Sequence, residues 1–336
     1  MILRDPYNRV LDYLRISVTD KCNLRCRYCI PPDGVEHLTH DEVLRNEEFL
    51  HFIELFAELG VRKIRFTGGE PLVRKGIIDI IAGARAAAPG IELCLTTNGV
   101  LLDGALAELM RLGVRKLNIS LDTMSSARYR EITGRDYFDR VLANIERAIA
   151  LGAFDLKINA VLFEDSLHEV NDFLEFFHDK DVMLRFIEQM PFTDDRAESG
   201  FVPADSLVER LAALGRLARN DRIDTSVAMM YDLEYRGGRA MRIGVIPPIT
   251  HTFCARCNRM RLTCDGMLKT CLHGTAEYDL KGPYRMDMGD DALRTIIRRA
   301  VAEKPCAHTL VCDSNTGQVC RSLEGAPVRP MSKIGG

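Results

Sequence analysis

The sequence has no long hydrophobic run, no strong excess of charge of one sign, no internal repeat and no low-complexity segment. A helix that spans a bilayer needs about 20 consecutive apolar residues, and no stretch of the chain approaches that length. A formal net charge of −3 argues against a general nucleic-acid binder. The first residues, Met1 to Asp5, lack the pattern of a signal peptide. We therefore expect a cytoplasmic protein with no membrane and no nucleic acid as partner.

Cysteine, in contrast, is plentiful. The 336 residues include 11 cysteines in a composition that is otherwise ordinary for a globular protein, 46% hydrophobic and 28% charged. Because the cytoplasm keeps thiols reduced, these cysteines are better explained as metal ligands than as disulfides. The length suits two domains, or one large α/β barrel with an appendage.

Strand-like and helix-like segments alternate along the first part of the chain. The strand-like runs are Leu14–Val18, Arg62–Phe66, Ile91–Thr96, Lys116–Ser120, Leu156–Val161 and Val182–Ile187. Apolar residues recur at helical spacing in residues 50–56, 138–149 and 167–177. This alternation predicts βαβ units and a parallel sheet. The units are too few for a closed eightfold barrel, so a partial barrel and an open doubly wound sheet both fit.

Unusual polar residues follow the ends of these strands. They are Cys22 to Cys29 after the first, Gly68-Gly69-Glu70-Pro71 after the second, Thr96-Thr97-Asn98-Gly99 at the third, Ser120 and Asp122 at the fourth, and Glu188 and Met190 after the sixth. Barrels and open α/β sheets build their sites at the carboxyl ends of strands. The convergence of these residues on one rim predicts a single active site.

The pattern changes after Met190. A polar linker or lid at residues 191–195 precedes an expected helix at residues 206–217. From about Ser226 a different region follows, with an expected strand at Met241–Ile246 and seven of the 11 cysteines. We therefore divide the chain into residues 1–225, the core, and residues 226–336, a C-terminal module.

The first cysteine set is Cys22, Cys26 and Cys29, which the sequence places in one tight loop. Soft thiolates select iron–sulfur clusters or zinc over hard cations. A four-iron cluster normally takes four thiolates, so a set of three leaves one iron open for chemistry. The alternative is a zinc or disulfide loop whose fourth ligand lies elsewhere.

A second cysteine set begins with Cys254 and Cys257. The pair can be a zinc hairpin, a redox pair or half of a cluster site. Further ligands are available from Cys264, Cys271, His251 and His273. Arg259 and Arg261 alternate just after the pair, so both can face one side of a strand. They are either solvated surface charge or a fork for phosphate or carboxylate.

Taken together, these motifs resemble those of the radical S-adenosylmethionine (SAM) enzymes, and more narrowly of the GTP 3′,8-cyclase family, which begins molybdenum cofactor biosynthesis. The matching segments are residues 14–20, the CxxxCxxC motif ending in Tyr28-Cys29, residues 63–71, 96–99, 120–122, 157–159 and 185–188, Cys254, Cys257 and Cys271 with Arg259 and Arg261, and the final Ile334-Gly335-Gly336. They span nearly the whole chain in the expected order. The resemblance implies an α/β fold, a partial (β/α)6 TIM-like barrel with a C-terminal α+β module that carries a second cluster.

The resemblance also implies roles for single residues. Two [4Fe-4S] clusters would be held by Cys22, Cys26 and Cys29, and by Cys254, Cys257 and Cys271. SAM would contact Tyr28, Gly69, Glu70, Ser120 and Met190, while GTP would contact Arg15, Arg65, Thr96, Lys157, Arg259 and Arg261. Cys271 is favoured over Cys264 as the last ligand because its interval fits the family. Cys94 is expected to be a packing residue, and Cys306, Cys312 and Cys320 have no assigned role.

The reaction implied by the resemblance is a radical cyclisation. A 5′-deoxyadenosyl radical from SAM would take the 3′ hydrogen of GTP, and the resulting carbon radical would attack C8 of guanine to give 3′,8-cyclo-7,8-dihydro-GTP. Arg259, Arg261, Gly335 and Gly336 are the expected catalytic residues, with the two glycines reaching the active site of their own chain. The expected partners are GTP, SAM, an electron donor and the enzyme that converts the product to cyclic pyranopterin monophosphate; a homodimer is the default assembly.

Two other interpretations fit parts of the sequence. Another radical SAM enzyme with an auxiliary cluster, such as a peptide maturase, would share the first cysteine set but would not need the basic residues. A zinc-binding interaction module on an α/β domain would account for the cysteines without any reaction. Roughly eight irons per chain would distinguish two four-iron clusters from zinc.

Overall fold

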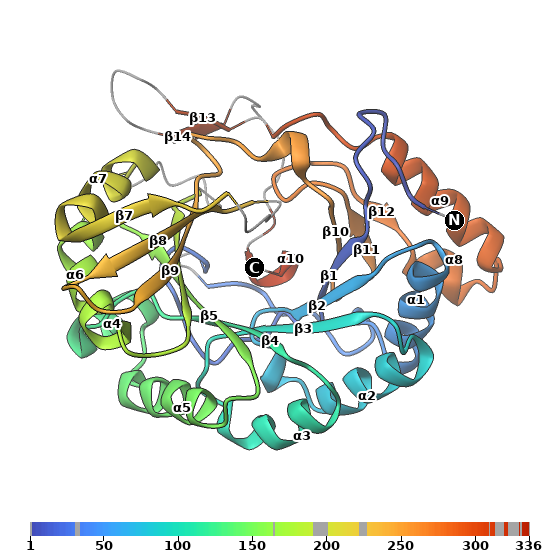
Figure 1. The fold of residues 1–336 in the computed structure, drawn as a ribbon. Helices are drawn as coiled ribbons and strands as arrows, with labels where there is room; N and C mark the ends of the chain where they lie inside the picture. The colour runs from blue at the N-terminus through green and yellow to red at the C-terminus, as the bar shows by residue number, and fades with distance from the viewer. Residues whose placement is uncertain are drawn as a thin grey trace.

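A curved twelve-stranded sheet forms the centre of the fold (Figure 1). The structure is a computed structural model, and it describes residues 2–30, 34–163, 165–190, 201–221, 227–308, 310–312, 319–321, 329 and 331–335. The strand order is β12-β11-β10-β1-β2-β3-β4-β5-β6-β9-β8-β7. Over the described residues its two outermost strands, β12 and β7, do not pair with each other, so the sheet is an open barrel.

The six predicted strands are confirmed, each within one residue at either end. They are β1 (Tyr13–Ser17), β2 (Lys63–Thr67), β3 (Glu92–Thr97), β4 (Lys116–Ser120), β5 (Asp155–Leu162) and β6 (Met183–Glu188). All five pairings between neighbours are parallel. Of the two folds that fit the alternation of strands and helices, the structure shows the partial barrel that the family resemblance implies.

Strands from the late part of the chain extend this sheet at both ends. Parallel pairs join β6 to β9 (Ala240–Ile246) and β1 to β10 (Arg259–Leu262). Antiparallel pairs then add β8 (Met229–Tyr235) and β7 (Gly215–Arg219) at one end. At the other end they add β11 (Met267–Lys269) and β12 (Tyr278–Asp279). The strand expected at Met241–Ile246 is thus present as β9. A separate hairpin consists of β13 (Leu310–Cys312) and β14 (Val319–Arg321).

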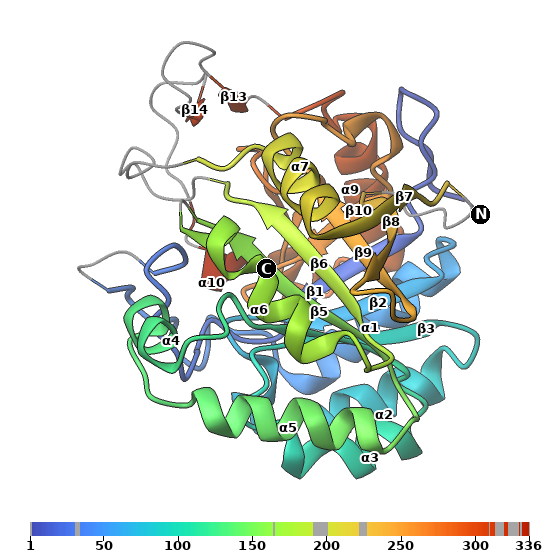
Figure 2. The same cartoon turned by 60° about the vertical axis from the view of Figure 1, so that its left-hand side comes forward.

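Helices cover the outside of the sheet, as Figures 1 and 2 show. They are α1 (Asn46–Glu58), α2 (Ile77–Ala87), α3 (Leu106–Arg111), α4 (Ser126–Thr133), α5 (Phe138–Ala150), α6 (Ser166–Phe177), α7 (Ala204–Leu214), α8 (Lys281–Arg285) and α9 (Asp290–Ala302). In contrast, α10 (Met331–Ile334) lies inside the curve of the sheet in Figure 1. No helix in the described part of the chain is long and apolar enough to cross a membrane.

One expected helix is shorter than the sequence suggests. The helix expected at residues 206–217 ends at Leu214, and β7 begins at Gly215. Gly215 pairs with Tyr235 of β8, and a Cβ atom at this position would meet the backbone carbonyl carbon of Glu234 at 3.2 Å. Glycine has a poor helix propensity and permits this close approach, so pairing with a strand remote in sequence replaces the last helical turn.

The core between sheet and helices is apolar and continuous. Phe49, Phe52 and Phe56 of α1 are fully buried against it. Val141 and Ile145 of α5 are buried at the helical spacing that predicted this helix. Because the helices fix the outer face of each strand, alternate side chains point into the hollow of the sheet. The chemically distinctive residues lie there and on its rim.

Candidate active site

The first cysteine set lies in the loop between β1 and α1. Backbone bonds from Arg25 to Thr133 (2.8 Å) and from Arg27 to Ile132 (3.0 Å) tie this loop to the end of α4. Within the loop, Cys29 N donates to Cys26 O at 2.9 Å. The loop is therefore anchored to the fold on both sides of Cys26.

The three thiols are close enough to perturb one another. Burial, followed by the charge of Cys22 and Asp122, raises the pKa of Cys29 to about 12. Burial also raises the pKa of Cys26 well above its usual range, with Asp122 and the two other thiols adding to the effect. Buried thiols of this kind stay protonated unless a metal supplies positive charge.

These residues fit an iron–sulfur cluster. Among the described residues, no three metal-binding side chains are grouped as a single ion would require. A cluster does not need that grouping because each thiolate binds a different iron. Three thiols that are close enough to act on one another match a cluster with one open iron.

Of the expected SAM residues, Tyr28 lies within this loop and Ser120 lies at the end of β4. The Tyr28 hydroxyl donates to Asp122 Oδ2 at 2.7 Å, and Val161 N donates to the other carboxylate oxygen at 2.9 Å. Burial raises the pKa of Asp122 to about 6. Ser120 is the last residue of β4, and its Cα is paired with that of Asn159. The loops after β1 and β4 thus meet the end of β5 here.

Gly69 and Glu70 join the loop after β2 to the loop after β1. Gly69 N donates to Thr19 O at 2.7 Å, and Glu70 N donates to Lys21 O at 2.9 Å. A Cβ atom on Gly69 would meet the backbone carbon of Lys21 at 2.7 Å, so only glycine allows this approach. The glycine is therefore required by the meeting of the two loops.

The Glu70 carboxylate is buried, and burial raises its pKa to about 7. It accepts from Thr97 Oγ1 (2.7 Å), Asn98 N (2.7 Å) and Leu72 N (3.1 Å). A carboxylate has about four acceptor positions, so one is left for a ligand. Met190 is half-buried on the opposite side of the rim, against Ile249.

The side chain of Glu188 binds backbone N–H groups and so holds neighbouring segments of the chain together. The Glu188 carboxylate is buried and accepts from the backbone N–H groups of Ala204 (2.8 Å), Ile249 (2.9 Å) and Thr250 (3.1 Å). It thereby joins the end of β6 to the start of α7 and to the chain that leads to Cys254. The linker expected at residues 191–195 lies outside the described residues.

The second cysteine set is brought together by the β10–β11 hairpin. Cys254 and Cys257 precede β10, and Cys257 N donates to Cys254 O at 3.1 Å. Arg261 of β10 is paired with Lys269 of β11, so the chain after β11 returns toward Cys257. Cys271 follows there, and the charges of Cys257 and Cys271 both act on the Cys254 thiol.

Cys264 lies at the other end of the same hairpin. It sits in the turn, where Gly266 N donates to Thr263 O at 3.0 Å. It is fully buried, and burial with nearby Asp265 and Asp20 raises its pKa to about 12. The hairpin register therefore groups Cys271, and not Cys264, with the pair.

The electrostatic surroundings of the second set are positive. Burial alone would raise the pKa of Cys257, but Lys304, Arg259 and Arg9 lower it below its usual value. The positive charges favour a thiolate, which is the form that binds metal. Cys254, Cys257 and Cys271 thus also fit an iron–sulfur cluster with one open iron.

Between the two sets, arginines line the hollow of the sheet. Arg261, Arg15 and Arg65 are in register on the adjacent strands β10, β1 and β2, so their side chains leave the sheet on the same face. Arg65 and Arg261 are each only 4% exposed. Burial, with the nearby Arg259 and Arg65, lowers the pKa of Arg15 to about 10.

Tyr13 is an acidic group that contacts these cations. Its hydroxyl accepts from Arg65 Nε at 2.7 Å. Burial would raise the pKa of Tyr13, but Arg65, Arg15, Lys63 and Arg259 lower it to about 8. A phenol cannot balance several guanidinium groups, so the hollow favours a ligand with several negative charges.

Thr96 and Lys157 line the hollow next to these arginines, in register with Asn118 between them. Asn118 is 7% exposed, and its side-chain oxygen has no hydrogen-bond partner among the described residues. A buried acceptor without a partner is costly, so a hydroxyl or N–H of a ligand fits this position. Lys157 Nζ donates to Asp155 at 2.9 Å.

The end of the chain enters the same hollow. Arg261 donates a hydrogen bond to the carbonyl oxygen of Gly335. The backbone of Ser332 forms a hydrogen bond with the thiol of Cys29. Gly335 has φ of +83°, and a Cβ atom there would meet Ser17 Cβ at 3.1 Å and would overlap Thr67 Oγ1. Glycine is needed at this position for both reasons. Gly336 lies outside the described residues.

Sequence reasoning missed two residues of the hollow, Arg185 and Asn159. Arg185 Nε donates to Asn159 Oδ1 at 3.0 Å, and burial with Arg65 lowers the pKa of Arg185 to about 9. Both residues belong to segments that carry the family resemblance, but no role was assigned to them. Their alternation with Lys157 and Ile187 along predicted strands was the available signal.

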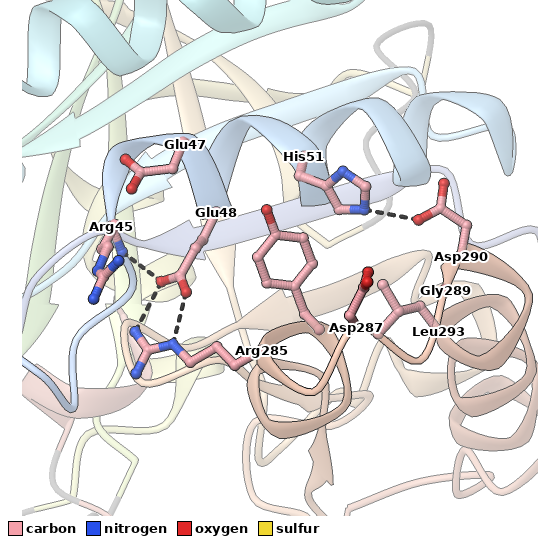
Figure 3. Close-up of a pocket in the computed structure, with 10 residues that line it drawn as sticks. Arg45, Glu47, Glu48, His51, Arg285, Asp287, Gly289, Asp290 and Leu293 are labelled. Atoms are coloured by element: carbon pink, nitrogen blue, oxygen red, sulfur yellow. Dashed lines mark hydrogen bonds and ion pairs between the residues drawn. The ribbon is translucent and has the colours of Figure 1, made fainter.

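A surface pocket between α1 and α8–α9 is unrelated to this site. Figure 3 shows that charged side chains line it and pair with one another. Arg285 Nε donates to Glu48 at 2.7 Å, and His51 lies 2.9 Å from Asp290. The charges in the pocket are largely satisfied by each other.

Comparison with known proteins is consistent with this geometry. A model of the Radical SAM superfamily matches residues 16–177, and a model described as Molybdenum Cofactor Synthesis C matches residues 182–310. Similar solved structures include Streptococcus suis SuiB bound to the precursor peptide SuiA (TM-score 0.62, 17% identity, 79% of this chain) and SuiB bound to S-adenosylmethionine (TM-score 0.59, 16% identity, 81% of this chain). The chain covers 61% and 62% of these two structures. At such low identity they show the fold alone.

Curated relatives are closer. A GTP 3′,8-cyclase from Peptoclostridium acidaminophilum is 39% identical over 100% of this chain and 98% of the relative. Those from Moorella thermoacetica (39% identity, 91% of this chain, 95% of the relative) and Nitrobacter hamburgensis (41%, 92% and 90%) are similarly close. Such identity over nearly the full length shows that the chain belongs to the GTP 3′,8-cyclase family of radical SAM enzymes.

Proposed function

We propose that this chain converts GTP to 3′,8-cyclo-7,8-dihydro-GTP, the first step of molybdenum cofactor biosynthesis, with SAM as cosubstrate. The observation that carries the proposal is the row Arg261, Arg15 and Arg65 between two sets of three cysteines. Buried guanidinium groups in register need a polyanion, and a triphosphate supplies one. A peptide without acidic side chains would leave this charge unbalanced.

In this proposal Cys22, Cys26 and Cys29 hold the cluster that binds SAM. When bound, the cluster and SAM together supply the 5′-deoxyadenosyl radical that starts the reaction. Tyr28, Gly69, Glu70, Ser120 and Met190 orient SAM at the rim. The walls of the half-open barrel exclude water and other hydrogen donors from the reacting carbon.

Cys254, Cys257 and Cys271 would hold a second [4Fe-4S] cluster, which would supply an iron able to bind the guanine of GTP. The triphosphate binds Arg15, Arg65, Lys157, Arg259 and Arg261, with Thr96 beside the nucleoside. These side chains would hold GTP in the hollow between the two cysteine sets. Positioning of this kind is the main contribution of the protein to the reaction.

In this proposal, residues 1–225 form the core and residues 226–336 form the C-terminal module. An electron donor must reduce the clusters, and a second enzyme must convert the product to cyclic pyranopterin monophosphate. A homodimer remains the proposed assembly.

The proposed function is tested on anaerobically purified full-length protein. Two clusters require roughly eight irons per chain. With GTP, SAM and dithionite, the expected products are 5′-deoxyadenosine and the cyclised nucleotide, detected by mass spectrometry. SAM cleavage without any cyclised nucleotide would contradict the proposed substrate, and zinc in place of iron would contradict the mechanism.

Removal of Gly335 and Gly336 is expected to lower cyclisation and to leave the iron content unchanged. Gly335 offers its carbonyl to Arg261, so the tail holds this guanidinium in the hollow. Loss of one hydrogen bond to a charged group costs about 1.5–3 kcal/mol, or roughly tenfold to hundredfold in kcat/KM. Unchanged turnover of the truncated chain would reject a role for the tail.

A further inference from the structure

Lys304 is a buried lysine beside the second cysteine set. It follows α9, and only 3% of its surface is exposed. Its ammonium nitrogen lies 3.8 Å from Cys257 Sγ and 3.0 Å from the carbonyl oxygen of Arg259. It also donates to the carbonyl oxygen of Thr270, the residue before Cys271. One cation thus joins both arms of the cysteine set.

Within the described part of the chain, the hydrogen-bond partners of this ammonium include no carboxylate. They are two neutral carbonyls and a sulfur. A buried cation is strongly disfavoured unless an anion lies close to it. Three thiolates on an oxidised four-iron core give a net charge of about −1, so a loaded cluster would supply that anion.

The two cysteine sets differ in the sign of the charges around them. At the first set, Asp122 and Glu70 are the acidic groups that act on the thiols, and the exposed Arg25 acts in the opposite direction on Cys22. At the second set, Lys304 is accompanied by Arg259 and by Arg9, which donates to Cys254 O at 2.7 Å. Arg9 forms an ion pair with Asp5, and the charge of Asp5 also acts on Lys304, but Lys304 itself makes no ion pair among the described residues.

We propose that Lys304 raises the reduction potential of the cluster held by Cys254, Cys257 and Cys271. It does so by donating a hydrogen bond to the Cys257 sulfur and by keeping a fixed positive charge beside it. Hydrogen bonds to the sulfurs and nearby charge are the means by which proteins set such potentials. Lys304 is a positioning residue in this role, since it acts through Cys257 and does not touch substrate.

The redox step that Lys304 would affect is the one-electron reduction of the second cluster. One electron from an external low-potential reductant, such as dithionite, enters the oxidised cluster. No bond forms or breaks, Lys304 stays protonated, and the net charge of the cluster with its thiolates changes from about −1 to about −2. A positive charge that stays beside the sulfur favours the more negative state. This inference rests on the second cluster of the proposed function.

The test uses the full chain with Cys22, Cys26 and Cys29 changed to alanine, so that only the second set can hold iron. In this parent, Lys304→Met removes the charge at similar volume, and Lys304→Arg keeps the charge. Lys75→Met, at an exposed lysine, controls for the change in net charge. The reduction potential is measured by a dithionite titration followed by electron paramagnetic resonance, without GTP or SAM.

The expected result is a fall of at least about tenfold in the equilibrium constant for reduction of Lys304→Met, which is about 59 mV for one electron. Lys304→Arg and Lys75→Met should stay close to the parent. An unchanged potential in an iron-loaded Lys304→Met protein overturns the role of Lys304. If that variant loses its iron, Lys304→Gln is measured in the same way. A lowered potential in Lys304→Gln supports the proposal, whereas an unchanged potential or loss of iron overturns it.

The parent protein separates this inference from the proposed function. A parent that binds no iron at the second set contradicts the second cluster itself, and the role of Lys304 falls with it. A parent with about four irons and a potential insensitive to Lys304 contradicts only the present inference.

Discussion

Replacing Arg261 with alanine is expected to abolish most of the cyclised nucleotide while SAM cleavage continues. Arg261 is buried in register with Arg15, and Arg259 adds a further positive charge nearby. Each lost hydrogen bond to a charged group costs about 1.5–3 kcal/mol. Because a guanidinium makes paired bonds to phosphate, we expect at least a hundredfold fall in kcat/KM for cyclisation. The measurement is the ratio of cyclised nucleotide to 5′-deoxyadenosine.

The stability of the unliganded protein should respond differently. Burial, together with Arg15 and Arg259, lowers the pKa of Arg261 well below its usual range, so its charge disfavours the empty fold. Without ligand, Arg261→Ala should therefore lower Tm less than truncation of other buried side chains does. The rise in Tm on adding GTP should be smaller in this variant than in the unchanged protein. Arg261→Lys keeps the charge but loses the paired N–H groups of the guanidinium, so its rise in Tm with GTP should lie between those of the unchanged protein and Arg261→Ala.

A matched control is available on the surface. The side chain of Arg216 on β7 is 82% exposed, and Arg216→Ala should change neither product ratio nor Tm appreciably. Arg259→Ala should resemble Arg261→Ala, because Arg259 lies on the same strand and beside the second cysteine set. If Arg261→Ala loses iron or stops cleaving SAM, the residue is structural and the proposed triphosphate site is wrong.

Much of the barrel could be predicted because its strands bury a row of apolar side chains under the helices. Short runs in which apolar residues recur, such as Leu156–Val161, are typical of strands, and they located β1 to β6 within one residue. The pairing of β10 with β1 was not predictable. It joins Tyr13 to Arg259, and no local pattern indicates a contact between segments so remote in sequence. This pairing creates the row of arginines, so the most informative feature of the site depends on tertiary structure.

Some residues of the site could likewise be predicted from the sequence, and others could not. Cysteines and glycines were recognisable because few residue types can replace them, as the approach of Gly69 to Lys21 shows. Lys304 was not recognisable, because a single lysine after a helix is usually solvated. Glu188 was expected at the rim, but its hydrogen bonds to Ala204 and Ile249 became visible only in the structure. Residues that act through backbone groups leave no motif in the sequence.

Replacing Cys271 with alanine is expected to lower the iron content from about eight to about four atoms per chain and to remove cyclisation. The hairpin register groups Cys271 with Cys254 and Cys257, and the charges of Cys257 and Cys271 both act on the Cys254 thiol. Cys264→Ala is the matched control, since Cys264 is fully buried in the turn of the same hairpin. That variant should keep all its iron and lose only about 1 kcal/mol of stability from the small cavity.

Iron analysis and the spectrum of the reduced protein distinguish the two variants directly. In Cys271→Ala the first cysteine set is intact, so dithionite and SAM should still yield 5′-deoxyadenosine, and the lost iron should be that of the second cluster alone. The hairpin explains why the effects differ, because β10 and β11 carry Cys257 and Cys271 to one end and Cys264 to the other. If Cys264→Ala lost four irons and Cys271→Ala kept them, the second cluster would have to lie at the turn, away from Arg259, and the site proposed for guanine would no longer exist.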